Sequence, residues 1–467
     1  MTKKKNHFKI FLCLPLLLLL ADCGNRSEKS AFYFQQPYNY KLNEEEIVLL
    51  DSIQQKTFLF FMNERNPENG LVKDRSASWA PASIAAIGFA LPSYAVGVER
   101  GWLTRNEAAD ITLRILKFFI NSVQNSDTNV TGYQGFYYHF LRMNSGTREW
   151  NCELSTVDTG LLMMGIIFSR NYFDQNSEIE NEIREIVAAL IKRMNWDFFQ
   201  MPETGNHPNS ISMGWTPEHG LHKMGWVGYN EALFLYILAA GSGMTNVETA
   251  FEEWLKSYDW RTPYPGLSHV AFPPLFGHQF SFCFIDPRGL KDKFIREKGI
   301  DFFENSRRAT YVQRQYAIDN PYNWAGYDSL CWGISASDGP TEKYNFDGKN
   351  FLGYAGRGTS GPDLNYFDDG TITPYASISS IVFAPEIVIP TIKSFNEKYS
   401  KSLWGPYGYF DAFNPTLNWF NKEYIGIAQG PLLLMIENFR SGLVWNYVMK
   451  DSVIQNGLKR LGFEYLN

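Results

Sequence analysis

Apolar residues recur at three- and four-residue spacing over most of the chain from residue 44 onward, which is the pattern of amphipathic helices. The first segment, NEEEIVLLDSIQQKTFLFFMNE, opens with Asn43 as the expected N-cap and carries acidic residues in its first turn. Short hairpins are predicted near 365–375 and 404–412, and the sequence has no regular run of alternating strands. The helical spacing predicts further helices at about 81–100, 105–123, 155–173, 177–194, 229–241, 247–257, 296–318, 376–396, 430–448 and 451–461, and a weaker one at 274–284.

Two kinds of helix can be distinguished by their polar positions. STVDTGLLMMGIIFSRNYF and GPLLLMIENF are apolar on nearly every side, which indicates burial all round, whereas SEIENEIREIVAALIKRMNW has one charged face. Alternation of the two kinds predicts an inner ring of helices wrapped by an outer ring, and six pairs would close into an all-α (α/α)6 toroid. An open array of helical repeats is the rival, but the sequence has no fixed-period self-similarity.

Long loops rich in Gly, Trp, Tyr, Asp and Glu separate the predicted helices. Loops of such length within a folded domain are usually functional or disordered. Because these loops are too aromatic for disorder, we expect them to form one ordered rim around the mouth of a central cavity. They cover residues 125–154, 200–228, 258–273, 320–375 and 403–429.

The N-terminal residues have the pattern of a lipoprotein export signal. Lysines at 3–5 precede an apolar stretch of about 13 residues, which is too short for a membrane span and suits a signal peptide. The stretch ends in LADC, which resembles the lipobox of bacterial lipoproteins and predicts lipidation of Cys23; a plain secretory signal is the alternative. We therefore expect a signal peptide at 1–22, a lipidated cysteine and tether at 23–43, and a single catalytic domain at 44–467. The anchor would hold the domain on a bacterial membrane, facing the periplasm or the cell surface.

Composition narrows the choice of partner. The 467 residues carry a net charge of −6 and contain no basic stripe, so nucleic acid is not an expected partner. Aromatic residues make up 16% of the chain, with 13 Trp and 26 Tyr, whose polar tips require partners that a core alone does not supply. Rings of this kind suit a wet groove, and sugars are the ligands that best use one. We expect the protein to be a monomer.

Two glutamates near the middle of the chain are candidates for acid–base chemistry. Glu218 lies in WTPEHG, where Pro217 and Gly220 favour a rigid turn beneath Trp215. Partial desolvation there would raise the pKa of the carboxyl group, as a general acid requires, although a purely turn-stabilising role stays open. Glu231 lies at the start of a very apolar helix. There it either takes part in catalysis or stabilises the helix through the charge of its dipole.

Further acids lie in loops and at another helix start. Glu153 and Asp158 both lie in ELSTVDTG. The alternative for Glu153 is a plain solvated side chain, and the alternative for Asp158 is an acid in the first turn of a helix. Asp338 in SASDGP and Asp411 in YGYFDAFNP lie in loops, where aspartate often organises a turn. Two other acids are expected to be structural and to pair with nearby arginines: Glu386 and Glu437.

Metal and cofactor sites have no support in the sequence. The histidines match no zinc-binding spacing, and hydrogen bonding in the wall of a groove is their expected role. No nucleophile elbow, phosphate loop or dinucleotide fingerprint is present, so we expect no metal and no cofactor. The remaining cysteines lie in apolar settings and are expected to be buried free thiols: Cys152, Cys283 and Cys331.

What remains is carboxylates, aromatic rings and neutral polar groups around one cavity. Glycoside hydrolysis needs this combination: one carboxylic acid protonates the leaving oxygen and a second carboxylate acts as base or nucleophile. Sequence order does not give the distance between the two carboxylates, so both inverting and retaining mechanisms stay open.

Eight segments resemble a known family in the order in which they occur. These are ELSTVDTGLLMMG, GWVGYNEALFLYILAAGSG, PLFGHQFSFCFIDPRG, FFENSRRAT, WGISASDGP, TPYASISSIVFAPE, YGYFDAFNP and GIAQGPLLLMIENFRSGLVW. They are similar to the glycoamylase-like domain family, which includes glycoside hydrolase family 144, the bacterial β-1,2-glucanases. The resemblance runs from about residue 45 to 463 and so covers nearly all of the predicted mature domain.

The resemblance implies an (α/α)6 barrel with a glycan-binding groove, no required metal, inversion at the anomeric carbon and a β-1,2-linked glucan or oligosaccharide as substrate. Glu153 and Asp158 match the acidic segment of the family, Glu218 and Glu231 its central segment, and Asp411 its C-terminal segment. One departure is Val227 in WVGYNEA, at a position that is often polar.

The leading hypothesis is a lipid-anchored glycoside hydrolase. We expect Glu218 to be the general acid and Asp411 the base-side carboxylate, with Glu231 as the acid if Glu218 is structural. Residues expected to bind sugar are the platforms Trp215, Trp226, Tyr229, Trp332 and Trp404 and the polar groups His219, His278, Arg307 and Asp338. Two alternatives stay open: a non-catalytic glycan-binding lipoprotein, and a polysaccharide lyase with a basic groove and a Tyr or His base.

Overall fold

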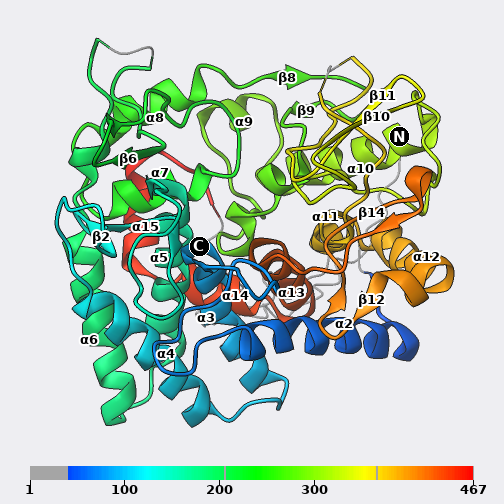
Figure 1. Ribbon diagram of the computed structural model, residues 1–467. Helices are drawn as coiled ribbons and strands as arrows, with labels where there is room; N and C mark the ends of the chain where they lie inside the picture. The colour runs from blue at the N-terminus through cyan, green and yellow to red at the C-terminus, as the bar shows by residue number, and fades with distance from the viewer. Residues whose placement is uncertain (1–39, 205–206, 364–365, 466–467) are drawn as a thin grey trace, which may run out of the picture.

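The computed structural model describes residues 40–204, 207–363 and 366–465. The predicted signal peptide at 1–22, Cys23 and most of the predicted tether lie outside the described residues. Within them the larger elements are all helices, and the strands form short pairs between helices (Figure 1). The prediction of a mostly helical protein is therefore confirmed.

Helices buried on nearly every side alternate along the chain with helices that keep an exposed face. The buried set comprises α3 (Ile84–Glu99), α5 (Thr156–Tyr172), α7 (Leu233–Gly241), the single-turn helices η3 (Leu275–His278) and η4 (Ser281–Cys283), α11 (Pro374–Ile378) with η5 (Ser379–Val382), and α13 (Gly426–Ser441). The half-exposed set comprises α2 (Glu44–Asn63), α4 (Arg105–Asn121), α6 (Glu178–Arg193), α8 (Val247–Leu255), α10 (Phe302–Asp319) and α12 (Pro385–Leu403). Shorter helices are η2 (Trp196–Phe199), α9 (Lys293–Glu297), η6 (Pro415–Leu417), α14 (Leu443–Val448) and α15 (Ser452–Arg460).

The two sets occupy different places in the molecule. Figure 1 shows α11 and α13 near the middle and α2, α6 and α12 toward the edge. Within the buried set, α3 packs against both α5 and α13, and α13 packs in turn against η5. The apolar sequences thus form an inner layer, as the hydrophobic pattern predicts.

Local sequence signals explain where several helices begin. Asn43 caps α2: its side chain accepts the Glu46 N–H at 2.9 Å, and the Glu46 carboxylate accepts the Asn43 N–H in return. Ser155 caps α5 in the same way by accepting the Asp158 N–H. Such caps satisfy the N–H groups that a helix start leaves free.

Three predicted helices are broken where the sequence carries a stop. The helix predicted at 376–396 is three elements: α11 runs into η5, and Pro385 starts α12 afresh after them. The helix predicted at 430–448 ends at Ser441, where Gly442 adopts φ 68° and caps α13. The one predicted at 296–318 is α9 followed by α10, each capped by its own aspartate.

Short antiparallel pairs connect the loops at the helix ends. The predicted hairpin near 404–412 is confirmed by β12 and β13, whereas residues 366–375 form no hairpin of their own. There Ile372 bridges to Phe413, and the hairpin of this loop lies earlier, at β10 and β11. The pairs are β1 (Ala82–Ser83) with β4 (Phe140–Leu141), β2 (Gly132–Tyr133) with β3 (Phe136–Tyr137), β6 (Gly214–Thr216) with both β5 (Leu154–Ser155) and β7 (Gly220–Leu221), β8 (Trp260–Arg261) with β9 (His269–Val270), β10 (Lys343–Phe346) with β11 (Lys349–Leu352), β12 (Trp404–Gly405) with β13 (Gly408–Tyr409), and β14 (Phe413–Asn414) with β15 (Trp419–Phe420).

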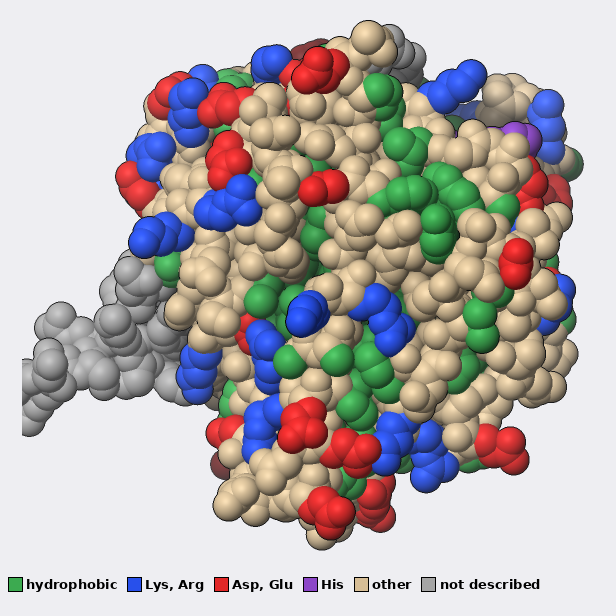
Figure 2. Space-filling view, turned by 90° about the vertical axis from the view of Figure 1, so that its left-hand side faces the viewer, with side chains coloured by type: hydrophobic (Ala, Val, Ile, Leu, Met, Phe, Trp, Pro, Cys, Tyr) green, Lys and Arg blue, Asp and Glu red, His purple; other side chains and the backbone are tan. Residues whose placement is uncertain are grey.

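Figure 2 shows one face of the surface, where acidic and basic side chains lie close together in small groups around a few apolar ones. In the described part of the chain, no helix combines the length and the hydropathy needed to cross a membrane.

Candidate active site

A cavity of about 880 Å³ opens among the loops at the helix ends. Its wall combines carboxylates with aromatic rings, and its residues come from segments far apart in the chain. These segments are 74–83, 139–161, 213–231, 276–280, 336–375 and 411–428. The predicted aromatic and acidic rim therefore surrounds a real hollow.

Glu231 lines this cavity directly before α7 begins. The Asn230 side chain accepts the Ala232 N–H at 2.9 Å, and the Ser281 hydroxyl donates to the Glu231 carbonyl at 2.6 Å, so the turn is held on both sides. Burial raises the pKa of the Glu231 carboxyl to about 7, and the negative charge of Asp158 adds to the shift. A carboxylic acid with this pKa is protonated in a large fraction of molecules near neutral pH.

Asp411 contributes a second carboxyl to the same cavity, and this one is buried. Its Oδ2 accepts the Asp338 N–H at 2.8 Å, whereas its Oδ1 is buried and has no hydrogen-bond partner among the described residues. Burial raises the pKa of Asp411 well above its usual range, the Asp338 charge adds to this, and Arg75 and Arg357 oppose it. One oxygen of Asp411 is thus fixed in place, and the other remains able to accept a hydrogen bond.

Arg75 is the cation that balances this acidic wall. Its Nη1 bonds Asp338 at 3.1 Å and Glu423 at 3.2 Å, and its Nε bonds Asp74 at 3.3 Å. Asn421 donates a further hydrogen bond to Asp338 at 2.8 Å. The network fixes the loop whose backbone N–H binds Asp411. The role of Asp338 is therefore to hold Asp411 in position.

A second acidic group faces the cavity from the start of α5. His139 Nδ1 lies 3.0 Å from Glu153, and His139 Nε2 lies 3.6 Å from Asp158. Although burial disfavours its charged form, Asp158 and Glu153 together raise the pKa of His139 to about 9. The three ligand atoms lie within 4.8 Å of one another, close enough for a metal ion, and a protonated imidazole offsets one of the two negative charges.

Aromatic rings complete the cavity wall. Trp226 lines it and donates its indole N–H to Thr156 at 3.0 Å, as expected for a ring that is fixed in place. Trp79 and Trp150 stand at the rim, with 62% and 52% of their surface exposed and their ring centroids 6.0 Å apart. Other lining residues with rings are Phe140, Phe276, Phe280, Tyr354 and Tyr375.

The expectation for Glu218 is wrong. Its carboxylate forms two hydrogen bonds with Arg148, at 2.7 and 3.0 Å, and it does not line the cavity. These bonds lower the pKa of Glu218 to about 2, so it stays ionised and cannot donate a proton near neutral pH. Pro217 and Gly220 do form a turn there, but the turn holds the carboxylate in an ion pair. Of the expected acids, Glu153, Asp158, Glu231 and Asp411 line the cavity.

Most of the expected sugar-binding residues also lie elsewhere. Trp332 is fully buried and donates to Thr391 at 2.8 Å, so it belongs to the core. Tyr229 and His278 are buried against each other with ring centroids 5.0 Å apart, and burial lowers the pKa of His278 well below its usual range. His219 is exposed on the hairpin loop beside Glu218.

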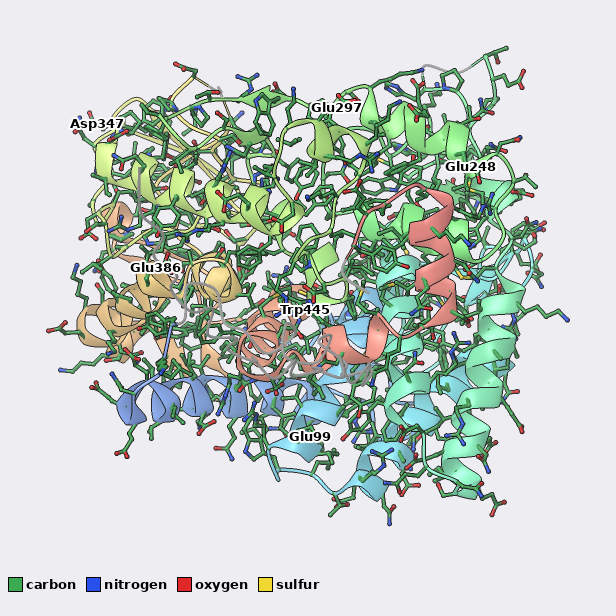
Figure 3. The ribbon with its side chains drawn as sticks, turned by 180° about the vertical axis from the view of Figure 1, so that it is seen from behind. Glu99, Glu248, Glu297, Asp347, Glu386 and Trp445 are labelled. Atoms are coloured by element: carbon green, nitrogen blue, oxygen red, sulfur yellow. The ribbon has the colours of Figure 1, made fainter. Side chains whose placement is uncertain are left out.

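Three further expected residues serve packing. Trp215 packs on Tyr133 at a centroid distance of 5.4 Å, and Trp404 packs edge-on against Tyr409 at 4.9 Å. Arg307 bonds Glu386 at 2.7 Å on α12, where Figure 3 labels Glu386. The predicted structural role of Glu386 is therefore confirmed, as is that of Glu437, which pairs with Arg100 at 2.7 Å. Of the expected binding residues, only Trp226 lines the cavity, and Asp338 supports it from behind.

Sequence reasoning missed several residues of the wall. Asp74 and Arg75 lie in a short charged turn, and His139 lies in the bend between β3 and β4, so neither segment carries a motif. Trp79 and Trp150 follow no helical or strand spacing, and exposure of their rings is the feature that distinguishes them. The richness of the 125–154 loop in aromatic residues was the available signal.

Solved structures share the fold that carries this cavity. A glucoamylase-family protein of Bacteroides uniformis is 32% identical, covers 92% of this chain and 100% of its own, and superposes with a TM-score of 0.78. An endo-β-1,2-glucanase of Chitinophaga pinensis, solved with sophorotriose and glucose, is 26% identical, covers 91% of this chain and 99% of its own, and has a TM-score of 0.76. The chain thus shares its helical fold with these solved proteins.

The family follows from these matches. A family model described as "Putative glucoamylase" matches residues 223–452. With the B. uniformis protein aligned over its whole length, the chain belongs to the glycoamylase-like family, and the resemblance drawn from the motifs is confirmed.

A curated relative extends the comparison. The exo-β-1,2-glucooligosaccharide sophorohydrolase (non-reducing end) of Parabacteroides distasonis is 25% identical over 485 residues. The match takes in 93% of this chain and 62% of the relative, so the chain spans less than two thirds of that protein's length.

Proposed function

We propose that the protein is a glycoside hydrolase that cleaves β-1,2-linked glucan or its oligosaccharides. The observation that carries the proposal is the pair of carboxyl groups on the wall of one aromatic cavity, the half-buried Glu231 and the buried Asp411. The relatives named above, a β-1,2-glucanase and a sophorohydrolase, support the choice of linkage.

Glu231 is the general acid in this proposal. With a pKa of about 7 it carries the proton that the glycosidic oxygen needs as the bond breaks. Asp411 is the base-side carboxylate, and its unpaired Oδ1 accepts a proton from the attacking water in an inverting displacement. The Arg75 network supports the ionised form of Asp411, because positive charge opposes the effect of burial.

We also propose that the helices close into an (α/α)6 toroid around the cavity. Each neighbour contact of the inner layer supports closure: α3 packs against α5, α5 against α7, and α13 against both η5 and α3. The gap between α7 and α11 is bridged by 278–283, where Ser281 accepts from the Phe234 N–H and Gln279 donates to the Ala376 carbonyl at 2.6 Å.

For the cellular setting we propose a monomeric lipoprotein, cleaved before Cys23 and anchored on a bacterial membrane with residues 44–467 as one catalytic domain. The lipobox-like LADC supports this proposal. Labelling with a radioactive fatty acid in a bacterial host, compared between the natural chain and Cys23→Ser, tests it.

The decisive experiment replaces Glu231 with Gln, which keeps the shape and removes the acid. We expect turnover of β-1,2-glucan to fall by about 10²–10⁴-fold while the affinity for the glucan changes by less than about threefold. Glu218→Gln is the matched control, because this change removes an ion pair outside the cavity and should leave turnover nearly intact.

Two results would contradict the proposal. Full activity of the Glu231→Gln protein would show that Glu231 is not the general acid. Binding of glucan with no turnover by the natural protein would indicate a glycan-binding protein, and ultraviolet-absorbing unsaturated products would indicate a lyase.

A further inference from the structure

A second hollow of about 880 Å³ lies next to the active-site cavity. The two share a wall: Trp79 and Trp150 line both of them. Any chain that leaves the cavity on this side therefore passes the two indole rings and enters the second hollow.

The second hollow is a built surface and not a gap between loose loops. Asn66 and Asn69 each donate a side-chain hydrogen bond to the Met143 carbonyl at 2.9 Å, which ties the segment 63–81 to the segment 142–150. Directly after the first segment and directly before the second, β1 pairs with β4 and joins the two again.

The two indoles are held exposed. Trp150 adopts φ 55°, a left-handed conformation that is rare for a bulky residue, and its ring packs edge-on against Phe140 at 5.0 Å. The Arg75 guanidinium lies 5.8 Å from the centre of the Trp79 ring. Rings that are fixed and yet solvent-facing offer the flat apolar faces on which pyranose rings stack.

The lining of the second hollow suits a neutral ligand rich in hydroxyl groups. Its charged residues are balanced, with three acids and three bases: Glu64, Glu68 and Glu149 against Arg65, Lys73 and Arg142. Arg65 Nε is buried there without a hydrogen-bond partner in the described part of the chain. An anionic polymer would meet as much repulsion as attraction in such a hollow, whereas amide, guanidinium and carboxylate groups all bind sugar hydroxyls.

We propose that this second hollow is a distal subsite, which binds the part of a long neutral β-glucan that extends beyond the cleavage cavity. The inference rests on the proposed hydrolase function, since it extends the same substrate. A protein with such a subsite should bind long glucan chains more tightly than short oligosaccharides.

The test compares glucans of two lengths, a short β-1,2-oligosaccharide that the cavity alone can hold and a long β-1,2-glucan. Arg142 and Asn144 are exposed residues of the second hollow that do not line the cavity, so the double variant Arg142→Ala/Asn144→Ala should fold. In a Glu231→Gln background, we expect calorimetry to show about tenfold weaker binding of the long chain, the loss of one charged hydrogen bond. Binding of the short chain should change by less than about twofold.

Arg296→Ala is the matched control, because Arg296 is an exposed arginine that pairs with Glu464 on the surface and lines neither hollow. Equal effects of the double variant on the two lengths, or no effect on either, would overturn the subsite. Failure of the natural protein to hydrolyse either length would overturn the hydrolase function, and the binding data would still decide whether the second hollow holds glucan.

Discussion

The Glu231 carboxyl stands at the edge of an apolar helix, and its surroundings determine its chemistry. Glu218 is only thirteen positions earlier in the chain and carries the same functional group. Burial raises the pKa of Glu231 to about 7, whereas hydrogen bonds from Arg148 lower the pKa of Glu218 to about 2. The two environments separate one carboxyl suited to proton donation from one that is permanently charged.

The first prediction concerns the pH dependence of the reaction. A general acid must be protonated, so kcat/KM should decline above about pH 7 as Glu231 loses its proton, approaching tenfold per pH unit. Initial rates on β-1,2-oligosaccharides between pH 5 and about pH 9 test this, with stability monitored in parallel. Rates that stay constant across neutral pH would count against Glu231 as the acid.

The same pKa has a consequence for stability. The folded state holds the Glu231 proton more tightly than the unfolded state, whose pKa is near 4.5, so the carboxyl destabilises the fold increasingly as pH rises from 4.5 to about 7. Glu231→Gln should therefore raise the free energy of unfolding by up to about 3 kcal/mol above pH 7 and by almost nothing at about pH 4. Urea unfolding at the two pH values measures the difference; an equal change at both would refute the linkage.

At the scale of elements, α3 and α5 of the inner layer lie very close together. A Cβ placed on Gly165 would lie 2.1 Å from the Gly88 carbonyl oxygen, so the two helices approach through backbone. A Cβ on Gly88 would likewise lie 2.4 Å from the Leu161 carbonyl oxygen, so the packing of these helices depends on small residues on both sides.

We predict that Gly165→Ala lowers the free energy of unfolding by about 1–3 kcal/mol, because the methyl group forces the two helices apart. Ser52→Ala, at an exposed position of α2, is the control and should change stability by less than about 0.5 kcal/mol. Thermal unfolding of the two variants and the natural protein makes the comparison. A Gly165→Ala protein as stable as the natural one would show that α3 and α5 can separate without loss.

The loop that carries Asp338 is organised around one buried cation. Arg357 has no exposed side-chain surface, pairs with Asp369 at 2.8 Å and donates to the carbonyls of Ser337 and Leu352, each at 2.8 Å. Through Ser337 it fixes the neighbouring Asp338 N–H that binds Asp411. A single side chain thus links the stability of the loop to the position of the base.

Arg357→Met should cost about 3–5 kcal/mol of stability, since it leaves Asp369 buried without its partner. Turnover should fall as well, because the Asp338 N–H is no longer held against Asp411. The double variant Arg357→Met/Asp369→Leu removes both charges and should recover part of the stability in a urea titration. Similar stability of the single and double variants would contradict a paired buried charge.

Across the whole molecule, some features of the fold and the site follow from local sequence and others do not. Helix α5 was predictable because its apolar residues and its Ser155 cap are local signals, and α12 was not, because the stop at Pro385 lies inside a continuous apolar pattern. Among the acids, local sequence identified Asp411 and Glu231 as candidates. It misplaced Glu218, since its partner Arg148 lies seventy positions earlier and is brought near by folding. His139 carries no motif and becomes part of the site only through contacts made in three dimensions.

The cavity wall draws residues from near both ends of the folded chain, from Asp74 to Ala428. No contiguous half of the protein contains both Asp74 and Asp411, so a fragment keeps at most one side of the wall. The protein's activity should therefore report on global folding: catalysis and helical circular dichroism should disappear at the same urea concentration, and a nicked or truncated chain should regain activity only when its pieces reassociate.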